Sequence, residues 1–100
     1  MEPLVRAQFY LDVAQEVELL AKRAGPETAV RWSDALELTI EELMRQPHLG
    51  RLRKDLKPDG VRSWRIKKFR RWMVFYQIDQ DSLILLRVRY GMMDLPTLNY

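Results

Sequence analysis

The sequence has few of the residues from which enzymes usually build their sites. None of its 100 residues is a cysteine, which excludes a disulfide framework, a thiolate zinc site and a cysteine nucleophile together. Its four glycines are scattered among predicted turns and cannot form a glycine-rich phosphate loop. The single histidine, His48, lies in a predicted turn without a metal-binding partner, and such a histidine is more often a surface residue than a catalyst. We therefore predict no metal and no cofactor.

Long apolar segments are also missing. The longest aliphatic run, Leu83 to Leu86, is far shorter than the roughly 20 residues that span a bilayer. The first residues, Met1 to Leu4, show neither the basic nor the apolar region of a secretory leader. With 47% hydrophobic and 31% charged residues, the composition is typical of a globular protein. We expect one cytoplasmic domain, residues 1–100, that does not contact a membrane.

Charge is divided unevenly between the two halves of the chain. Residues 1–50 contain five Lys/Arg and nine Asp/Glu, a net charge of −4, whereas residues 51–100 contain twelve and five, a net charge of +7. Ten basic residues fall within 51–71 alone, where they are interleaved with Trp64 and Phe69. This split indicates an acidic or polyanionic partner, although a solvated face that favours solubility gives the same pattern.

Two helical patterns occupy the first half of the chain. Apolar residues recur at helical spacing from Phe9 to Ala24 and again from Ala29 to Leu43. Gly25 is expected to end the first helix, Pro26 fits the first turn of the second, and Pro47 stops it. A connection this short folds the two helices back on each other as a hairpin.

The second half changes to the period of two that is typical of strands. After a weak short strand at 4–7, strands are expected at 61–69, 72–78 and 83–90, with a break at Arg70–Arg71 and a hairpin turn at 79–81. The order β-αα-βββ predicts an α+β fold in which a helical hairpin packs on one face of an antiparallel sheet.

Alternation along the last strand predicts which side chains share a face. It groups Ile84, Leu86, Val88 and Tyr90 on one face and sets Leu85, Arg87 and Arg89 on the other. The uncovered face of the sheet would then carry four basic side chains at its rim: Arg65, Lys67, Arg87 and Arg89.

Arginine and tyrosine are the residue types left to do chemistry. The guanidinium fork donates two parallel hydrogen bonds to a phosphate, and several arginines could stabilise the charge that develops when a ribose 2′-hydroxyl attacks a phosphodiester. A tyrosine would need cationic neighbours to move a proton near neutrality. The candidates for a ribonuclease of this kind are Arg65, Lys67, Arg87 and Tyr90. We favour the other interpretation of Tyr90, a strand-end core aromatic with its hydroxyl at the rim.

Five segments together carry a family resemblance. They are Pro26 to Ala29, Gln46 to Arg51, Gly60 to Trp64, Met73 to Ile78, and Leu86 to Gly91 followed by Asp94-Leu95-Pro96. In their order and spacing the chain resembles, over nearly its whole length, the ParE branch of the RelE/ParE superfamily, whose members are toxins of type II toxin–antitoxin modules.

The resemblance implies a RelE/ParE-like fold and a small toxin that a cognate antitoxin holds inactive. The antitoxin would wrap the hairpin and sheet with an acidic, amphipathic C-terminal segment, giving a toxin–antitoxin hetero-oligomer. ParE-like members are associated with inhibition of DNA gyrase, and RelE-like members with cleavage of mRNA on the ribosome. The family often has His where Tyr90 stands and Arg where Met93 stands, so the tail of this chain is less cationic.

Three functions follow from the resemblance. The first is a non-enzymatic inhibitor of DNA gyrase, the second a ribosome-dependent mRNA endoribonuclease, and the third an inactive module that still pairs with its antitoxin. The residues expected to bind the antitoxin or the target are Arg51, Arg62, Arg65, Lys67, Arg87, Arg89 and Tyr90.

Overall fold

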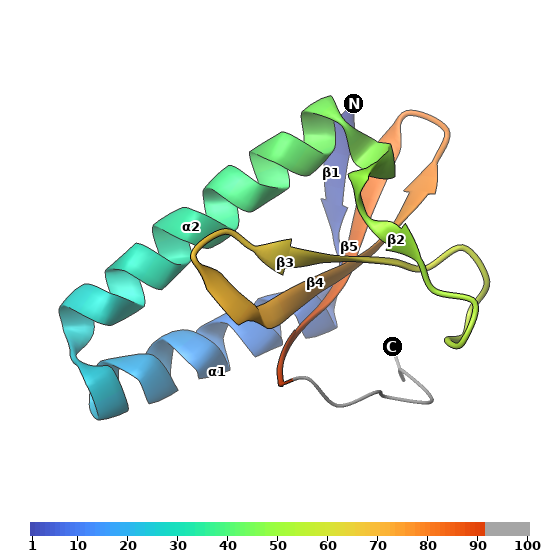
Figure 1. Ribbon diagram of the computed structural model, residues 1–100. Coiled ribbons are helices and arrows are strands. Elements are labelled where there is room, and N and C mark those ends of the chain that lie inside the picture. The colour runs from blue at the N-terminus through green and yellow to red at the C-terminus, as the bar shows by residue number, and fades with distance from the viewer. Residues whose placement is uncertain (92–100) are drawn as a thin grey trace.

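Two long helices follow a short first strand in the computed structural model, which describes residues 1–91 (Figure 1). Helix α1 spans Ala7–Ala24 and helix α2 spans Pro26–Arg45. Between them Gly25 takes a φ of 96°, a conformation that favours glycine, and Pro26 opens α2 at the position where a missing N–H leaves no bond unmade. A short 3₁₀ helix, η1 (Pro47–Leu49), follows α2. The predicted hairpin and both of its stop signals are confirmed.

The rest of the described chain forms one five-stranded sheet. The strands are β1 (Glu2–Val5), β2 (Arg51–Leu52), β3 (Arg62–Ile66), β4 (Phe69–Asp79) and β5 (Ser82–Tyr90), in the spatial order β1-β5-β4-β3-β2. The α+β fold, with a helical hairpin on a sheet, is confirmed. Strands β2 to β5 pair antiparallel, but β1 runs parallel to β5, so the sheet is mixed. The helical hairpin supplies the long crossover that a parallel pair needs.

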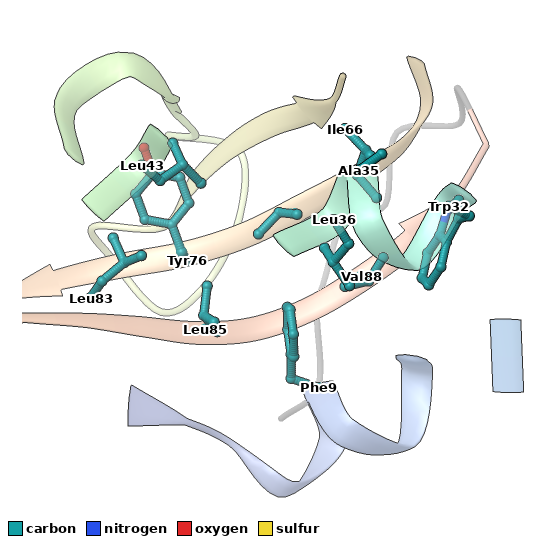
Figure 2. Close-up of a cluster of buried hydrophobic side chains, with 11 residues drawn as sticks. Phe9, Trp32, Ala35, Leu36, Leu43, Ile66, Tyr76, Leu83, Leu85 and Val88 are labelled. Atoms are coloured by element: carbon teal, nitrogen blue, oxygen red, sulfur yellow. The ribbon is translucent and has the colours of Figure 1, made fainter. Parts of the chain in front are cut away.

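The main core fills the space between the two helices and one face of the sheet (Figure 2). Its fully or almost fully buried members are Phe9, Trp32, Ala35, Leu36, Leu43, Ile66, Val74, Tyr76, Leu83, Leu85 and Val88. Burying one large apolar side chain of this kind contributes about 1.5–3 kcal/mol relative to leaving it exposed. This layer therefore fixes the hairpin on the sheet and leaves the opposite face of the sheet free for other uses.

The opposite face of the sheet is only partly covered. The segment between β2 and β3 folds back over it, and its Leu56 and Val61 pack on Phe75 and on the apolar residues of β5. Met73, two residues earlier in β4, is only half-buried, and Arg65 beside it is exposed. A part of this face around Met73 therefore remains open to solvent.

An extra residue in β5 shifts its register against β4. Phe75 lies opposite Arg87, but the next residue of β4, Tyr76, lies opposite Leu85. Leu86 is thus the unpaired residue of a β-bulge, which reverses the alternation of side chains beyond it.

The bulge corrects the predicted faces of the last strand. Leu85 and Val88 both pack toward the helices, whereas Ile84 and Leu86 pack on the other face. The prediction that Leu86 and Val88 share a face is therefore wrong. Residues 83–86 are apolar on both faces, so the period of two does not tell which of their side chains face the helices. A bulge among them therefore leaves no trace in the sequence pattern.

The turn between β3 and β4 also differs from the prediction. It is formed by Lys67 and Lys68, and Lys68 takes a φ of 71°. Arg70 and Arg71 belong to β4, so the predicted break at these two residues is wrong. A register shift between Arg65 and Ile66 accommodates the extra residues of β4. The hairpin predicted at 79–81 is confirmed, with its turn between the end of β4 and the start of β5.

Candidate functional site

Arg87, one of the four predicted rim cations, contacts helix α1 instead of the open face. Its Nε donates to Oδ2 of Asp12 at 2.7 Å, and its Nη2 donates to Oδ1 at 3.1 Å. The backbone N–H of Val88 donates to the same carboxylate at 3.0 Å. The Arg87 and Asp12 side chains are only 11% and 7% exposed.

This contact corrects the prediction that Arg87 lies at the open rim. Arg87 follows the bulge residue Leu86 and lies beyond the part of β5 that pairs with β1, where Asp12 of α1 binds both its guanidinium and the N–H of Val88. Charge-assisted bidentate bonds of this kind fix both partners, and burial makes the loss of either one costly. Arg87 and Asp12 therefore form a structural pair that joins β5 to α1.

The cations of the open face gather around Met73. The register places Arg65 of β3 and Arg89 of β5 on either side of Met73 in β4. Neighbouring strands are about 4.8 Å apart, so the Cα atoms of the two arginines are about 10 Å from each other. Within residues 1–91 neither arginine forms an ion pair.

A broad hollow of about 1070 Å³ is lined by Arg65, Met73 and Arg89 and extends over the β3 side of the sheet. Eight of the residues that line it are basic, and among its described lining residues Glu42 is the only acid. The eight are Arg51, Arg53, Arg65, Lys67, Lys68, Arg70, Arg71 and Arg89. We call this hollow the basic basin. It concentrates the positive charge that the sequence shows between residues 51 and 71.

Two glutamates of the helices bind tryptophan side chains. Glu42 of α2 accepts a hydrogen bond from Nε1 of Trp64 at 3.2 Å. Glu16 of α1 accepts one from Nε1 of Trp72 at 3.0 Å. Both glutamates thus bind indole N–H groups, and no ion pair within residues 1–91 joins them to the basin's cations.

Arg53 differs from the other basic residues of the basin because it is buried and paired. It donates to Asp55 through Nε at 2.9 Å and through Nη2 at 2.7 Å, and its guanidinium lies 5.8 Å from the centre of the Phe75 ring. Hydrogen bonding to Arg53 lowers the pKa of Asp55 to about 2. Asp55 therefore stays charged at physiological pH, and it offsets the charge of Arg53.

The predicted binding residues separate into two groups. Five of them line the basin: Arg51, Arg65, Lys67, Arg89 and Tyr90. Arg62 and Arg87 do not line it, because Arg62 donates to the carbonyl of Gly50 at 2.8 Å and Arg87 binds Asp12. Tyr90 is 54% exposed and packs edge-on against Trp72, with 4.7 Å between the ring centres.

Tyr76 attaches the turn after α2 to the sheet. Its hydroxyl donates to the carbonyl of Pro47 at 2.6 Å and accepts from the N–H of Gly50 at 2.9 Å. Burial raises the pKa of the Tyr76 hydroxyl above its ordinary value of 10.0. Because Arg51 directly follows Gly50, this anchor sets the position of one edge of the basin.

The Tyr76→Phe variant is expected to be less stable by about 1–3 kcal/mol, since it leaves Gly50 N–H and Pro47 C=O without their partner. The pKa shift adds a pH dependence: the native hydroxyl holds its proton more tightly than the unfolded one. The free energy of unfolding of the wild type therefore falls as pH rises past about 10. Urea unfolding at pH 7 and pH 11 should show the gap between the two proteins narrowing at the higher pH. An equal difference in unfolding free energy between the two proteins at pH 7 and at pH 11 would contradict the role given to this hydroxyl.

Residues 1–91 contain neither a candidate metal site nor a candidate membrane span. No group of three or more His, Cys, Asp or Glu side chains in this range is placed to hold a metal ion. Neither described helix has an apolar stretch that could cross a membrane. Met93 and the Asp94-Leu95-Pro96 motif lie outside the described residues.

Comparisons with known proteins bear on this architecture. A family model, described as the ParE toxin of the type II toxin–antitoxin system parDE, matches residues 6–95. The chain belongs to the ParE toxin family. It is 32% identical over 71 residues to the toxin ParE3 of Caulobacter vibrioides. This match covers 71% of this chain and 67% of that toxin. A solved structure described as the chromosomal ParDE TA system from P. aeruginosa has a chain that matches this ParE-family protein with a TM-score of 0.76. That match covers 91% of this chain and 96% of the other, and at 15% identity it shows a shared fold.

Proposed function

We propose that this ParE-family chain inhibits DNA gyrase by binding, and that a cognate antitoxin neutralises it by covering the basic basin with an acidic, amphipathic segment. The observation that carries the proposal is the basin itself. Seven of its eight basic residues have no ion-pair partner within residues 1–91: Arg51, Arg65, Lys67, Lys68, Arg70, Arg71 and Arg89. A surface of one charge sign attracts an oppositely charged partner and speeds its approach. Toxin, antitoxin and gyrase would meet in the cytoplasm.

The placement of the candidate catalytic residues supports binding over RNA cleavage. Stabilising an in-line attack needs several donors within hydrogen-bond distance of one phosphate. Arg87 is held by Asp12, at 2.7 Å from Nε to Oδ2. Tyr90 pairs with Trp72 while its neighbour Arg89 pairs with Met73, so Tyr90 and Arg89 take opposite faces of β5. Arg87 therefore does not join Arg65, Lys67 and Tyr90, which line the basin, in a single phosphate-binding group.

The proposal is tested with purified gyrase and relaxed plasmid. The folded chain should block supercoiling, and an equimolar amount of antitoxin should restore it. An Arg65→Gln/Arg89→Gln variant should inhibit less than the wild type, because the open face loses two cations. The matched control, Arg23→Gln/Arg31→Gln, changes two exposed helix residues and should inhibit as the wild type does.

One outcome would overturn the gyrase proposal. If excess folded chain leaves supercoiling untouched, the chain is not a gyrase inhibitor. A translation extract then decides between the two other functions. New mRNA 5′ ends that the Tyr90→Phe variant no longer makes would identify a ribonuclease, and tight antitoxin binding without either activity would identify an inactive binding module.

A further inference from the structure

We propose that the open face of the sheet within the basic basin binds the phosphate backbone of duplex DNA. The toxin would then contact the DNA on which its target works, in addition to the target protein. The choice of duplex DNA among polyanions rests on the proposed function. The existence of a face that binds phosphate rests on the arginines alone. Three arginines carry the inference: Arg65 in β3, Arg71 in β4 and Arg89 in β5.

The spacing of these arginines suits a nucleic-acid backbone. Arg65 and Arg89 flank Met73, about 10 Å apart across two strand spacings. Arg71 lies two residues before Met73, about 7 Å along the strand, and its carbonyl accepts from the N–H of Gly91 at 2.8 Å. One DNA strand presents a phosphate about every 3.4 Å along the helix axis, so a span of about 10 Å faces about three phosphates.

The chemistry of the face also favours phosphate. Arginine binds phosphate oxygens through two parallel charge-assisted hydrogen bonds, which a lysine cannot reproduce. Within residues 1–91 none of the three arginines forms an ion pair, while Asp55 and Asp12 are bound by Arg53 and Arg87. Like charges held close together on a sheet repel one another, and phosphates placed between them remove that cost.

Within the basin, the open face around Met73 offers little apolar surface, so the apolar side of an amphipathic antitoxin segment would have to pack elsewhere. Amphipathic peptides bind by inserting apolar side chains into pockets. Phe75 on this face is 4% exposed, because Arg53 and the segment between β2 and β3 cover it. Met73, which lies between Arg65 and Arg89, is half-buried. A phosphate backbone needs no such pocket, so the face matches DNA better than it matches an apolar anchor.

Fluorescence anisotropy of a short labelled DNA duplex tests the proposal. The wild type should bind with an affinity that falls steeply between 50 and 200 mM salt, because each neutralised phosphate adds about 0.9 to the slope of log K against log salt. The Arg65→Gln/Arg71→Gln/Arg89→Gln variant should bind at least about tenfold more weakly at 50 mM, with a slope shallower by about 2.7.

Two further variants separate the open face from charge in general and from misfolding. The Arg23→Gln/Arg31→Gln/Arg45→Gln control loses the same charge from exposed helix positions and should retain the wild-type slope. The Arg65→Lys/Arg71→Lys/Arg89→Lys variant keeps the charge and should retain most of the salt slope. Urea midpoints measured for all variants establish that each one is folded.

Several results would overturn the inference. They are an absence of duplex binding by the wild type at 50 mM salt, an equal loss of affinity in the helix control, and tighter binding of polyglutamate or an RNA hairpin than of the duplex. The gyrase assay keeps the two proposals apart. If the chain inhibits gyrase but does not bind the duplex, the DNA contact is wrong and the proposed function stands. If the chain binds the duplex but does not inhibit gyrase, the DNA contact stands and the proposed function is wrong.

Discussion

The Asp12→Ala variant is expected to lose about 3–5 kcal/mol of stability, because the substitution leaves the Arg87 guanidinium buried without this carboxylate. It also removes the acceptor of the Val88 N–H, which is buried two residues beyond the bulge of β5. A loss of this size is a large share of the 5–15 kcal/mol that typically separates a folded domain from its unfolded chain. Urea unfolding followed by circular dichroism measures it.

Two further variants show whether burial causes the loss. Glu18→Ala removes an exposed pair on the same helix, in which Lys22 lies 3.0 Å from the carboxylate, and it should cost no more than about 0.5 kcal/mol. In an Asp12→Leu/Arg87→Met variant no charge remains buried and unpaired, so much of the lost stability should return. Equal costs for Asp12→Ala and Glu18→Ala would show that the buried pair does not join β5 to α1 as described.

The Gly50→Ala variant is expected to lose about 3 kcal/mol, through overpacking rather than backbone strain. Gly50 has a φ of −66° and a ψ of 143°, which any residue can adopt. An added Cβ would overlap the Tyr76 hydroxyl and come within 2.7 Å of its ring carbon Cε1. Tyr76 is fully buried and its hydroxyl is bound at both sides of the turn, so the ring has little room to retreat.

A double-mutant cycle identifies the collision as the cause. In a Tyr76→Phe background the hydroxyl is gone and the ring is released from its anchors, so Gly50→Ala should cost clearly less than it does in the wild type. Gly25→Ala provides the contrast, since Gly25 has a φ of 96° and nothing within 4 Å of an added Cβ. Its cost comes from the backbone and should be the same in both backgrounds. Full additivity of Gly50→Ala and Tyr76→Phe would contradict the proposed overlap.

Local signals in the sequence were enough to predict the helical layer. The helical period, Gly25 with Pro26, and Pro47 each act within a few residues, and the structure has both helices where these signals place them. The faces of β5 could not be predicted, because a one-residue bulge among apolar residues 83–86 is decided by pairing with β4. The partner of Asp12 could not be predicted either, since Arg87 lies 75 residues away along the chain.

The basic basin was predictable as a charge excess but not as a set of residues. Its cations come from β2, β3, β4, β5 and the turns between them, so its membership depends on register. The structure removes Arg62 and Arg87 from the predicted group, and it adds Arg53, Lys68, Arg70 and Arg71. Tyr76 gave one usable signal, because a tyrosine rather than a phenylalanine on the core face of a strand needs a partner for its hydroxyl.

The parallel pairing of β1 with β5 bears on how the protein matures. It joins residues 2–5 to residues 82–85, so the first strand to be synthesised must wait for the last before its pairing can form. Contacts between such distant parts of a chain close a long loop and slow folding. The native sheet is therefore reached only after residues 82–85 have been synthesised. In the proposed function, the antitoxin then has an interval in which to meet the toxin before the newly made chain becomes active.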